Sequence, residues 1–291
     1  MFFALLQTLR PKQWIKNLFV GVPLMFGQKL TDPTSLLITA GAIGLFCLVS
    51  GCVYILNDLV DLEKDRAHPK KRHRPLPSGR LSPTLARNFA VITVAVCLAL
   101  GYYLEPLYAL ILGVYLANNV AYSFKVKHVA YLDVLSIAFG FLLRVLAGAA
   151  ALELPPSPWL LGCMGLLATF LGFGKRAHEL GAGEDQARKQ RAVLEHYSPG
   201  ALRWIMHSLA VVTIAVYVLY TTSEHVEQLF HTHLLPYTAV FGIVGVLRFN
   251  YLATTRHDAE SPTEEMLKDP LFMGNFLLWV VSIAAILYGW I

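Results

Sequence analysis

The sequence predicts an all-α, multi-pass membrane protein, and three observations support that prediction. The chain has 291 residues, of which 56% are hydrophobic and only 15% are charged, whereas soluble domains carry about 25% charged residues. The charges are also clustered, which leaves long uncharged apolar runs between them. Several of these runs approach the roughly 20 residues that a helix needs to cross a bilayer. We therefore expect one continuous helical membrane domain over residues 1–291.

Nine apolar segments are candidates for membrane-spanning helices. The first is short and contains Pro23, and a short interfacial helix over 2–10 is expected before it. Pro106 and Pro270 lie near segment boundaries, where proline is tolerated because the first turn of a helix needs no amide donor. The predicted spans are 17–31, 35–56, 84–104, 107–124, 132–152, 157–174, 202–222, 232–252 and 270–290.

The lysines and arginines orient these spans. With nine spans, nearly all the Lys and Arg residues of the connecting segments lie on one side, and the opposite side receives only Lys29. Because positively charged loops stay in the cytoplasm, we expect a cytoplasmic N-terminus and an external C-terminus. The membrane that we expect is a bacterial inner (plasma) membrane. The net charge of +5 follows from this topology and does not indicate nucleic-acid binding. The polar cavity and the functional site are expected on the cytoplasmic side.

The spacing of the cysteines and histidines argues against the zinc and haem sites that these residues commonly form. The four cysteines lie inside apolar stretches without ligand spacing, and the ten histidines are scattered. We expect neither zinc nor haem.

The most informative segment is NDLVDLEKDRAHPKKRHRP, which runs from 57 to 75. If the second span continues helically through 65, Asp58, Asp61 and Asp65 share one face because residues three and four apart are neighbours on a helix. Oxygen ligands of this kind select a hard ion such as Mg²⁺, which binds one or two carboxylates together with substrate phosphates. The cations that follow would bind the same phosphates. The alternative is a solvated helix end with ordinary cytoplasmic positive charge.

This segment resembles the NDxxDxxxDR signature of the UbiA superfamily of intramembrane prenyltransferases, whose fold is a nine-helix bundle. The match is complete at Asn57, Asp58, Asp61, Asp65 and Arg66. Within that superfamily the chain is most similar to the branch that transfers phosphoribosyl groups to decaprenyl phosphate. The stretches that carry this closer similarity are LRPKQWIKN at 9–17, RAHPKKRHRP at 66–75, YSFKVKHVAYLDV at 122–134, GFLLRVLAGA at 140–149 and GKRAHEL at 174–180.

The resemblance implies a magnesium-dependent enzyme that transfers 5-phosphoribosyl from phosphoribosyl diphosphate (PRPP) to a membrane polyprenyl phosphate and releases diphosphate. Asp58 and Asp61 would be the catalytic residues, and they would hold Mg²⁺ on the diphosphate with help from Asp65 and Asn57. The partners are thus PRPP, a polyprenyl phosphate and the bilayer, and a homo-oligomer is left open. The expected substrate-binding residues are Lys12, Lys16, Asn57, Arg66, Lys71, Arg74, Tyr122, Lys125, Lys127, Arg144, Lys175 and Arg176.

The region after the fourth span departs from the pattern of the prenyl-diphosphate enzymes, which have a second aspartate-rich motif. Here it offers Tyr122, Lys125, Lys127 and one carboxylate, Asp133. One acidic cluster with one lysine-bearing loop suits a donor that has a diphosphate at one end and a separate monophosphate. The alternatives are lipid-headgroup contact for the lysines and, for Asp133, a helix N-terminal charge favoured by the macrodipole.

Three further features have both a functional and a structural interpretation. Arg144 lies inside the fifth span, where a charge is costly, so it must face the bundle interior and have a partner there. That partner is a substrate phosphate, a motif aspartate or a purely structural ion pair. Lys175 and Glu179 could form a simple helix-surface pair. The resemblance instead implies that they belong to a loop over the polar cavity, in which Lys175 or Arg176 would bind phosphate. The segment 181–199 has mixed charge and two glycines, which suggests a mobile lid.

Two other functions remain open at this point. A prenyltransferase that uses a polyprenyl diphosphate and an aromatic or other acceptor would need the same first motif. A transporter of divalent cations or organic anions would place charges near the middle of the membrane and in both halves of the bundle, whereas these charges gather at one face. A donor–acceptor panel separates the phosphoribosyltransferase from the prenyltransferase. Uptake into sealed vesicles without chemical conversion would indicate the transporter.

Overall fold

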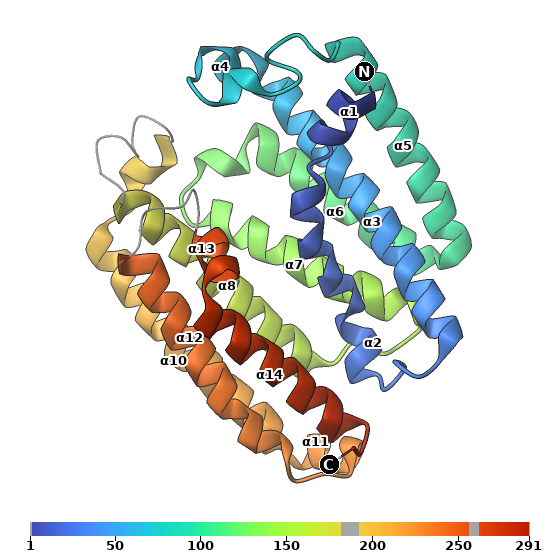
Figure 1. Ribbon diagram of the computed structural model, residues 1–291, viewed down its shortest axis with the longest axis vertical. Coiled ribbons are helices and arrows are strands. Elements are labelled where there is room, and N and C mark those ends of the chain that lie inside the picture. The colour runs from blue at the N-terminus through green and yellow to red at the C-terminus, as the bar shows by residue number, and fades with distance from the viewer. Residues whose placement is uncertain (1, 182–191, 256–261, 291) are drawn as a thin grey trace. The chain divides into compact units, whose positions relative to one another are not determined.

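The computed structural model describes residues 2–181, 192–255 and 262–290, and every regular element in these ranges is a helix (Figure 1). Within them, eight helical segments are long and apolar enough to cross a membrane. This confirms the all-α, multi-pass prediction. Of the lid proposed over 181–199, residues 182–191 lie outside the described ranges, and Ala192–His196 form a short 3₁₀ helix. The eight segments are α3 (Pro33–Val60), α5 (Pro83–Leu104), α6 (Pro106–Phe124), α7 (Leu132–Ala151), α8 (Pro158–Gly181), α10 (Pro199–Thr221), η5 (Leu235–Thr238) with α12 (Ala239–Thr255), and α14 (Pro270–Leu287).

The predicted count of nine spans is not confirmed, because the first predicted span is not one continuous helix. The N-terminal segment instead forms α1 (Phe2–Thr8), the 3₁₀ helix η1 (Pro11–Gly21) and α2 (Val22–Phe26). Pro23 at the start of α2 lacks an amide donor, and Gly27 follows its end, so the sequence cannot sustain a long α-helix here. The segment η1 packs along α3 (Figure 1).

The chain divides into two compact units, and each is described by itself. Unit 1 contains residues 1–127 and 140–156, and unit 2 contains residues 128–139 and 157–291. The division passes through α7. The single domain over 1–291 that the sequence suggested stays a prediction.

Unit 1 is built around α3, whose inner face packs on η1, α5 and α6. Its main core joins side chains of these helices to the C-terminal part of α7, with Phe46, Tyr108 and Leu112 fully buried. A smaller core near the other end of α3 includes Ile55 and Leu76. Many outward-facing residues of α5 are large and apolar, such as Val91 and Ile92, as expected for a helix that faces lipid. The remaining short elements of unit 1 are α4 (Leu62–Ala67), η2 (Lys71–His73) and η3 (Val126–His128).

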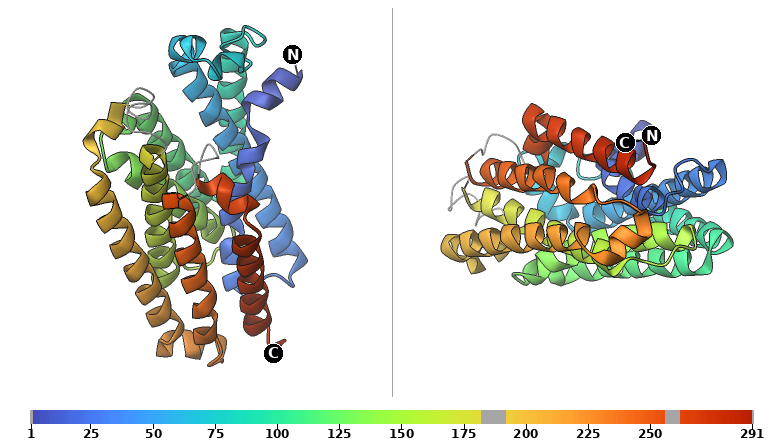
Figure 2. Two further views of the ribbon diagram at one scale, coloured as in Figure 1. Left: turned by 60° about the vertical axis from the view of Figure 1, so that its left-hand side comes forward. Right: turned by 90° about the horizontal axis from the view of Figure 1, so that it is seen from below.

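Unit 2 is a bundle in which α8 packs on α10 and α12, and α12 packs on α10 and α14. These helices run side by side in all the views (Figure 2). The core contains Phe170 and Phe249, whose rings meet edge to face with centroids 5.2 Å apart. The short elements of this unit are η4 (Ala192–His196), α11 (Glu224–Phe230) and α13 (Pro262–Lys268).

Candidate active site

The site begins where α3 ends. Asp58 belongs to the last turn of α3, and Asp61 is the residue between α3 and α4, with φ −95° and ψ 12°. The predicted helix through 65 is therefore interrupted at Asp61. The amide of Asp61 still donates to the carbonyl of Asn57 (3.0 Å), and that of Asp65 donates to the carbonyl of Asp61 (2.8 Å). Because the helical hydrogen bonding continues, the three aspartates stay on one side, as the spacing predicted.

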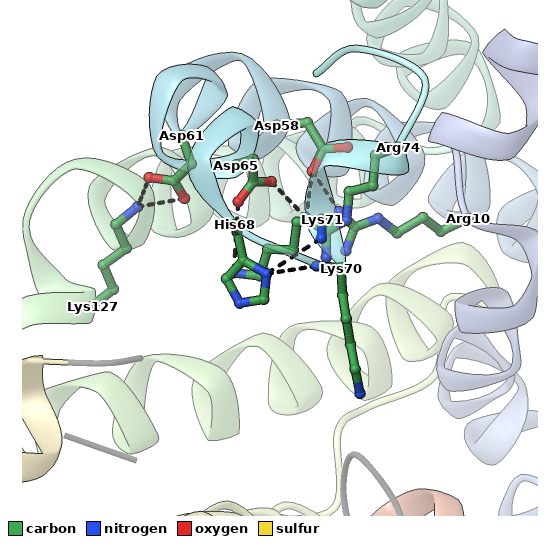
Figure 3. Close-up of polar contacts among 9 residues, drawn as sticks. All are labelled: Arg10, Asp58, Asp61, Asp65, His68, Lys70, Lys71, Arg74 and Lys127. Carbon is green, nitrogen blue, oxygen red and sulfur yellow. Dashed lines mark hydrogen bonds and ion pairs between the residues drawn. The ribbon is translucent and has the colours of Figure 1, made fainter. Parts of the chain in front are cut away.

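These aspartates do not point into bulk solvent. Asp58 and Asp65 are only 2% and 3% exposed, and Asp61 is half-buried. Isolated carboxylates at such positions would be costly, so each requires a cation. Figure 3 shows that the chain itself supplies these cations.

Arg74 joins two of the aspartates. Its Nη1 lies 2.8 Å from Oδ2 of Asp65 and 3.4 Å from Oδ1 of Asp58 (Figure 3). Lys71 lies 3.6 Å from the other oxygen of Asp65. Both cations come from the basic segment after α4, whose predicted role is to bind substrate phosphates, and both side chains are partly open to solvent.

Lys127 closes the site from η3, at the end of α6. Its ammonium group lies 2.9 Å from both carboxylate oxygens of Asp61. This contact joins residues 66 positions apart. The lysine-bearing loop and the acidic stripe are therefore brought together, as the sequence suggested. The neighbouring Lys125 is exposed.

Arg10 is the site residue that sequence reasoning left out of the substrate-binding set. Its Nη2 lies 2.5 Å from Oδ1 of Asp58, and its guanidinium covers the Tyr54 ring at 4.8 Å from the centroid. Arg10 has φ 53°, in the left-handed region that non-glycine residues rarely adopt. Such a conformation is retained where surrounding contacts hold it. The signal available in the sequence was that Arg10 belongs, with Lys12, Trp14 and Lys16, to a basic and aromatic stretch that is suited to the membrane interface or to a lipid phosphate.

Other predicted residues lie around this cluster with different partners. Asn57 accepts a short hydrogen bond from Ser123 at the end of α6. Arg66 turns away from the aspartates and pairs with Glu63 at 2.7 Å, where both side chains are exposed. In η1, Lys12 is exposed and Lys16 is half-buried; Tyr122 on α6 is also half-buried.

Arg144 is buried inside unit 1, as its position within a span required. Its guanidinium donates to Asn17 Oδ1 (2.9 Å), the carbonyl of Gly140 (2.8 Å) and the Tyr115 hydroxyl (3.0 Å). All three partners are neutral. Within the described part of the chain, neither of the carboxylate partners considered from the sequence contacts it.

Unit 2 contains a second acidic cluster, centred on Asp133. This carboxylate is fully buried; it accepts a hydrogen bond from the Tyr197 hydroxyl at 2.6 Å and lies 2.9 Å from Nε of Arg176. Arg176 also forms a short ion pair with Glu179. Burial, together with the hydrogen bond to Asp133, raises the pKa of Tyr197. Asp133 is thus neutralised within its own unit, and so is Arg176; the adjacent Lys175 is half-buried.

The donor chemistry of the acidic stripe suits Mg²⁺. Carboxylate oxygens are the ligands that this ion prefers, and it needs only one or two of them when substrate phosphates complete its shell. In the described ranges no three acidic, histidine or cysteine side chains are grouped so that they could hold an ion by themselves. The oxygen donors of the aspartates therefore fit Mg²⁺ when substrate phosphates complete its shell.

Comparison with known proteins identifies the family. The model of the UbiA prenyltransferase family matches residues 18–275. The chain belongs to this family. It is 32% identical over 300 residues to the decaprenyl-phosphate phosphoribosyltransferase of Mycolicibacterium smegmatis, with 98% of this chain and 92% of the relative covered. The enzyme of the same name from Corynebacterium glutamicum is 31% identical over 294 residues, with 98% and 87% covered.

Solved structures of UbiA homologues share the fold. A UbiA homologue from Archaeoglobus fulgidus bound to DMAPP and Mg²⁺ matches with a TM-score of 0.71 at 16% identity, and 98% of each chain is covered. The same homologue bound to Cd²⁺ matches with a TM-score of 0.70 at 17% identity, covering 98% of this chain and 99% of that one. With eight apolar helices in the part of the chain that the structure describes, this UbiA-family chain is an integral membrane protein.

Proposed function

We propose that this UbiA-family protein transfers the 5-phosphoribosyl group from phosphoribosyl diphosphate to a polyprenyl phosphate in the membrane. The observation that carries the proposal is the ion pair between Lys127 and Asp61, considered with the similarity to the two phosphoribosyltransferases. It puts a lysine from the α6 end against the first acidic motif, where an enzyme with two acidic motifs would present another carboxylate. The site therefore has an excess of cations, which favours a donor that carries phosphate at both ends.

The described ion pairs give the charge balance of the site. Arg10, Lys71, Arg74 and Lys127 face Asp58, Asp61 and Asp65. All four cations keep some exposure, so they can exchange a carboxylate partner for a phosphate oxygen without first leaving a closed core. Charge-assisted contacts from arginine and lysine to phosphate are among the stronger hydrogen bonds in proteins.

The transfer itself needs little proton chemistry. An oxygen of the lipid phosphate attacks C1 of the ribose, the bond from C1 to the diphosphate oxygen breaks, and its electron pair leaves with the diphosphate. The attacking phosphate is already an anion, so no strong general base is required. Arg10, Arg74 and Lys127 would orient the donor and stabilise the charge on the departing diphosphate.

Asp58 and Asp61, with Asp65, would hold Mg²⁺ against the donor. The bound ion would supply neutralisation of the diphosphate charge as it leaves. Lys12, Lys16, Asn57, Tyr122 and Lys175 stay predicted substrate-binding residues. Arg66, Lys125 and Arg176 were in the predicted set as well, but we expect them to contribute little to donor binding, because Arg66 and Lys125 are exposed and Arg176 is closed into an ion pair with Asp133. The N-terminus and the site would face the cytoplasm, where the soluble donor is found, and the C-terminus would be external.

The test is a donor–acceptor panel with the purified protein in lipid nanodiscs. Radiolabelled phosphoribosyl diphosphate and decaprenyl phosphate are supplied with Mg²⁺, and the lipid product is identified by mass. A phosphoribosylated lipid that forms only with divalent metal is the expected result. The same chain with Asp61→Asn is the control for contaminating activity.

The runner-up is a prenyltransferase that joins a polyprenyl diphosphate to an aromatic or other acceptor. Its support is the name of the family and the DMAPP-bound homologue of the same fold. Turnover of a polyprenyl diphosphate, with no transfer from phosphoribosyl diphosphate, would reverse the ranking.

A further inference from the structure

The N-terminal segment η1 carries no carboxylate of the site, yet it follows directly after Arg10, which contacts Asp58. It is a 3₁₀ helix of 11 residues, and such helices are weakly stabilised because their hydrogen-bond geometry is poorer than in an α-helix. Its place in unit 1 therefore depends on contacts with neighbouring helices. Three of these contacts are unusually close or polar.

Just before η1, at Leu9, the chain approaches Gly51 of α3. A Cβ added there would lie 2.7 Å from a methyl carbon of Leu9 and 3.3 Å from its carbonyl oxygen. At the end of η1, the chain approaches α7 at Gly148, where a Cβ would lie 1.8 Å from the carbonyl oxygen of Val20. Each glycine is therefore needed for the contact that holds one end of the segment.

The middle of η1 is held by Asn17, which is buried. Its side-chain amide donates to Ser50 Oγ on α3 at 2.9 Å, and its carbonyl oxygen accepts from Nε of Arg144 on α7 at 2.9 Å. Asn17 thus links α3 and α7 through η1. The link is made of buried polar groups, and such groups are costly when one partner is lost.

Arg144 is itself fixed by its surroundings. Besides its three hydrogen bonds, its guanidinium carbon lies 4.9–5.3 Å from the centroids of Phe46, Tyr115 and Phe141. Aromatic faces attract a cation, so these three rings stabilise the charge where no carboxylate of the described residues does. The side chain is 7% exposed, and three of its five donors already have partners.

The polar groups also form a continuous stripe on α3. Ser50, Tyr54 and Asp58 are spaced by four residues, which places them on one face, and they span about 12 Å along the axis. Asn17 contacts the first, and Arg10 contacts the second and third. The N-terminal segment therefore contacts this stripe twice: Asn17, which Arg144 holds, contacts one end of it, and Arg10 contacts the end at the site.

We propose that Arg144 is a positioning residue: through Asn17 it holds η1 against α3 and α7, and by doing so it keeps Arg10 on Asp58. In this role Arg144 does not touch substrate. Its effect on the reaction passes through the position of the N-terminal segment. The kinetic part of this inference rests on the proposed function, whereas the structural part does not.

The structural part is tested by a distance measurement that needs no activity. Spin labels are placed at Ile15→Cys on η1 and Val96→Cys on α5, both of which are exposed, and the distance distribution is measured by pulsed electron resonance. We expect Arg144→Met and Asn17→Ala to broaden and shift the distribution, and Arg144→Lys to do so less because it keeps the charge. Arg87→Met, at an exposed position on α5, is the matched control and should change nothing.

An unchanged distribution in both Arg144→Met and Asn17→Ala would overturn the proposal. If Arg144→Met does not accumulate as folded protein, Asn17→Ala and Arg144→Lys still decide the question. The unlabelled parent, whose four cysteines are buried or half-buried, gives the background of labelling.

The kinetic part is tested by a double-mutant comparison in the phosphoribosyl transfer assay. Displacement of a positioning group by about 1 Å can lower activity about 100-fold, and we expect Arg144→Met to lower kcat/KM by about tenfold or more. If Arg144 acts through Arg10, the same substitution in an Arg10→Ala background should have little further effect. Additive losses, or a loss of activity with an unmoved N-terminal segment, would show that Arg144 acts on substrate directly and would refute the proposal.

Failure of this inference and failure of the proposed function are distinguishable. A wild-type chain that transfers no phosphoribosyl group would refute the proposed function and leave the distance measurement valid. A wild-type chain that does transfer it, with no movement of η1 in the variants, would refute only the positioning role.

Discussion

Two of the ion-pair clusters in the described residues, the Asp58–Asp61–Asp65 cluster of unit 1 and the Asp133–Arg176 cluster of unit 2, differ in their access to solvent. In unit 1, Asp58 and Asp65 are buried, but Arg74 is 34% exposed and Lys71 is 43% exposed. In unit 2, Asp133 and Arg176 are both closed to solvent, at 0% and 1%. This difference in solvent access indicates that the same residue types serve two purposes, the proposed substrate binding in unit 1 and structural support in unit 2. Cations with an open side can exchange a carboxylate for a phosphate, whereas a fully closed pair can only hold its helices together.

The most severe test of this comparison is Asp61→Asn in unit 1. The substitution removes the charge that pairs with Lys127 and one of the proposed magnesium ligands, so transfer should fall by about 1,000-fold. Asp61 is half-buried and its neighbours can reach solvent, so the melting temperature should stay close to that of the parent chain. Steady-state transfer and thermal unfolding are measured on the same preparation. Substantial retained activity would contradict the assignment of Asp61.

The counterpart in unit 2 is Arg176→Met. It leaves the buried Asp133 without its cation, and breaking such a pair costs about 3–5 kcal/mol. We expect a large drop in melting temperature, measured by fluorescence-detected unfolding. Activity per folded molecule should fall much less than in Asp61→Asn. A stable protein that has lost affinity for phosphoribosyl diphosphate would instead restore Arg176 to the substrate site.

Lys127→Met sharpens the comparison within unit 1. We expect the KM for phosphoribosyl diphosphate to rise about tenfold, because the lost contact is a charge-assisted one. Lys125 lies two positions earlier in the sequence, and its side chain is exposed. Lys125→Met is therefore the matched control and should change the KM less than twofold. Equal effects of the two substitutions would mean that general positive charge, and not the contact with Asp61, is what matters.

Tyr197→Phe probes the closed cluster more gently. The Tyr197 hydroxyl donates a hydrogen bond to Oδ1 of the buried Asp133, with the two oxygens 2.6 Å apart. Loss of this hydrogen bond leaves a buried acceptor unsatisfied, which costs about 1–3 kcal/mol. We expect a moderate fall in melting temperature that is smaller than in Arg176→Met. A parent-like melting curve would show that the Asp133 cluster carries little of the stability of unit 2.

Arg66→Ala should have the smallest effect. Its partner Glu63 and the arginine itself are exposed, and surface pairs of this kind contribute about 0–1 kcal/mol. Stability should be unchanged within error, and the KM for phosphoribosyl diphosphate should change less than twofold. A large rise in KM would mean that Arg66 turns toward the donor when it binds, in line with its place in the NDxxDxxxDR signature.

Much of the fold could be read from local pattern. Apolar runs bounded by charge located the helices from α3 onward, because the bilayer thickness sets how long such a run must be. The failure at residues 17–31 has a local cause as well: Pro23 and the flanking glycines break an apolar segment into η1 and α2. Composition alone did not distinguish a broken helix from a continuous one.

The geometry of the acidic stripe could be predicted from its spacing, whereas the roles of the site residues stay predictions. The spacing of Asp58, Asp61 and Asp65 was sufficient to place them on one face, because helical hydrogen bonds persist through the break at Asp61. The basic segment after α4 was also expected to supply Lys71 and Arg74. Arg10 was not in the predicted set, because its contact with Asp58 joins residues 48 positions apart and depends on how η1 packs against α3.

The sequence by itself determined which segments are apolar helices, which helix end carries the carboxylates and which family the chain resembles. These properties follow from hydropathy and helical period, which act over one or two turns. Only the tertiary structure decided which cation meets which carboxylate: Lys127 with Asp61, Arg10 with Asp58, and Arg176 with Asp133. Such pairings join distant positions, and they depend on which helices pack together and on how much water each packed interface excludes.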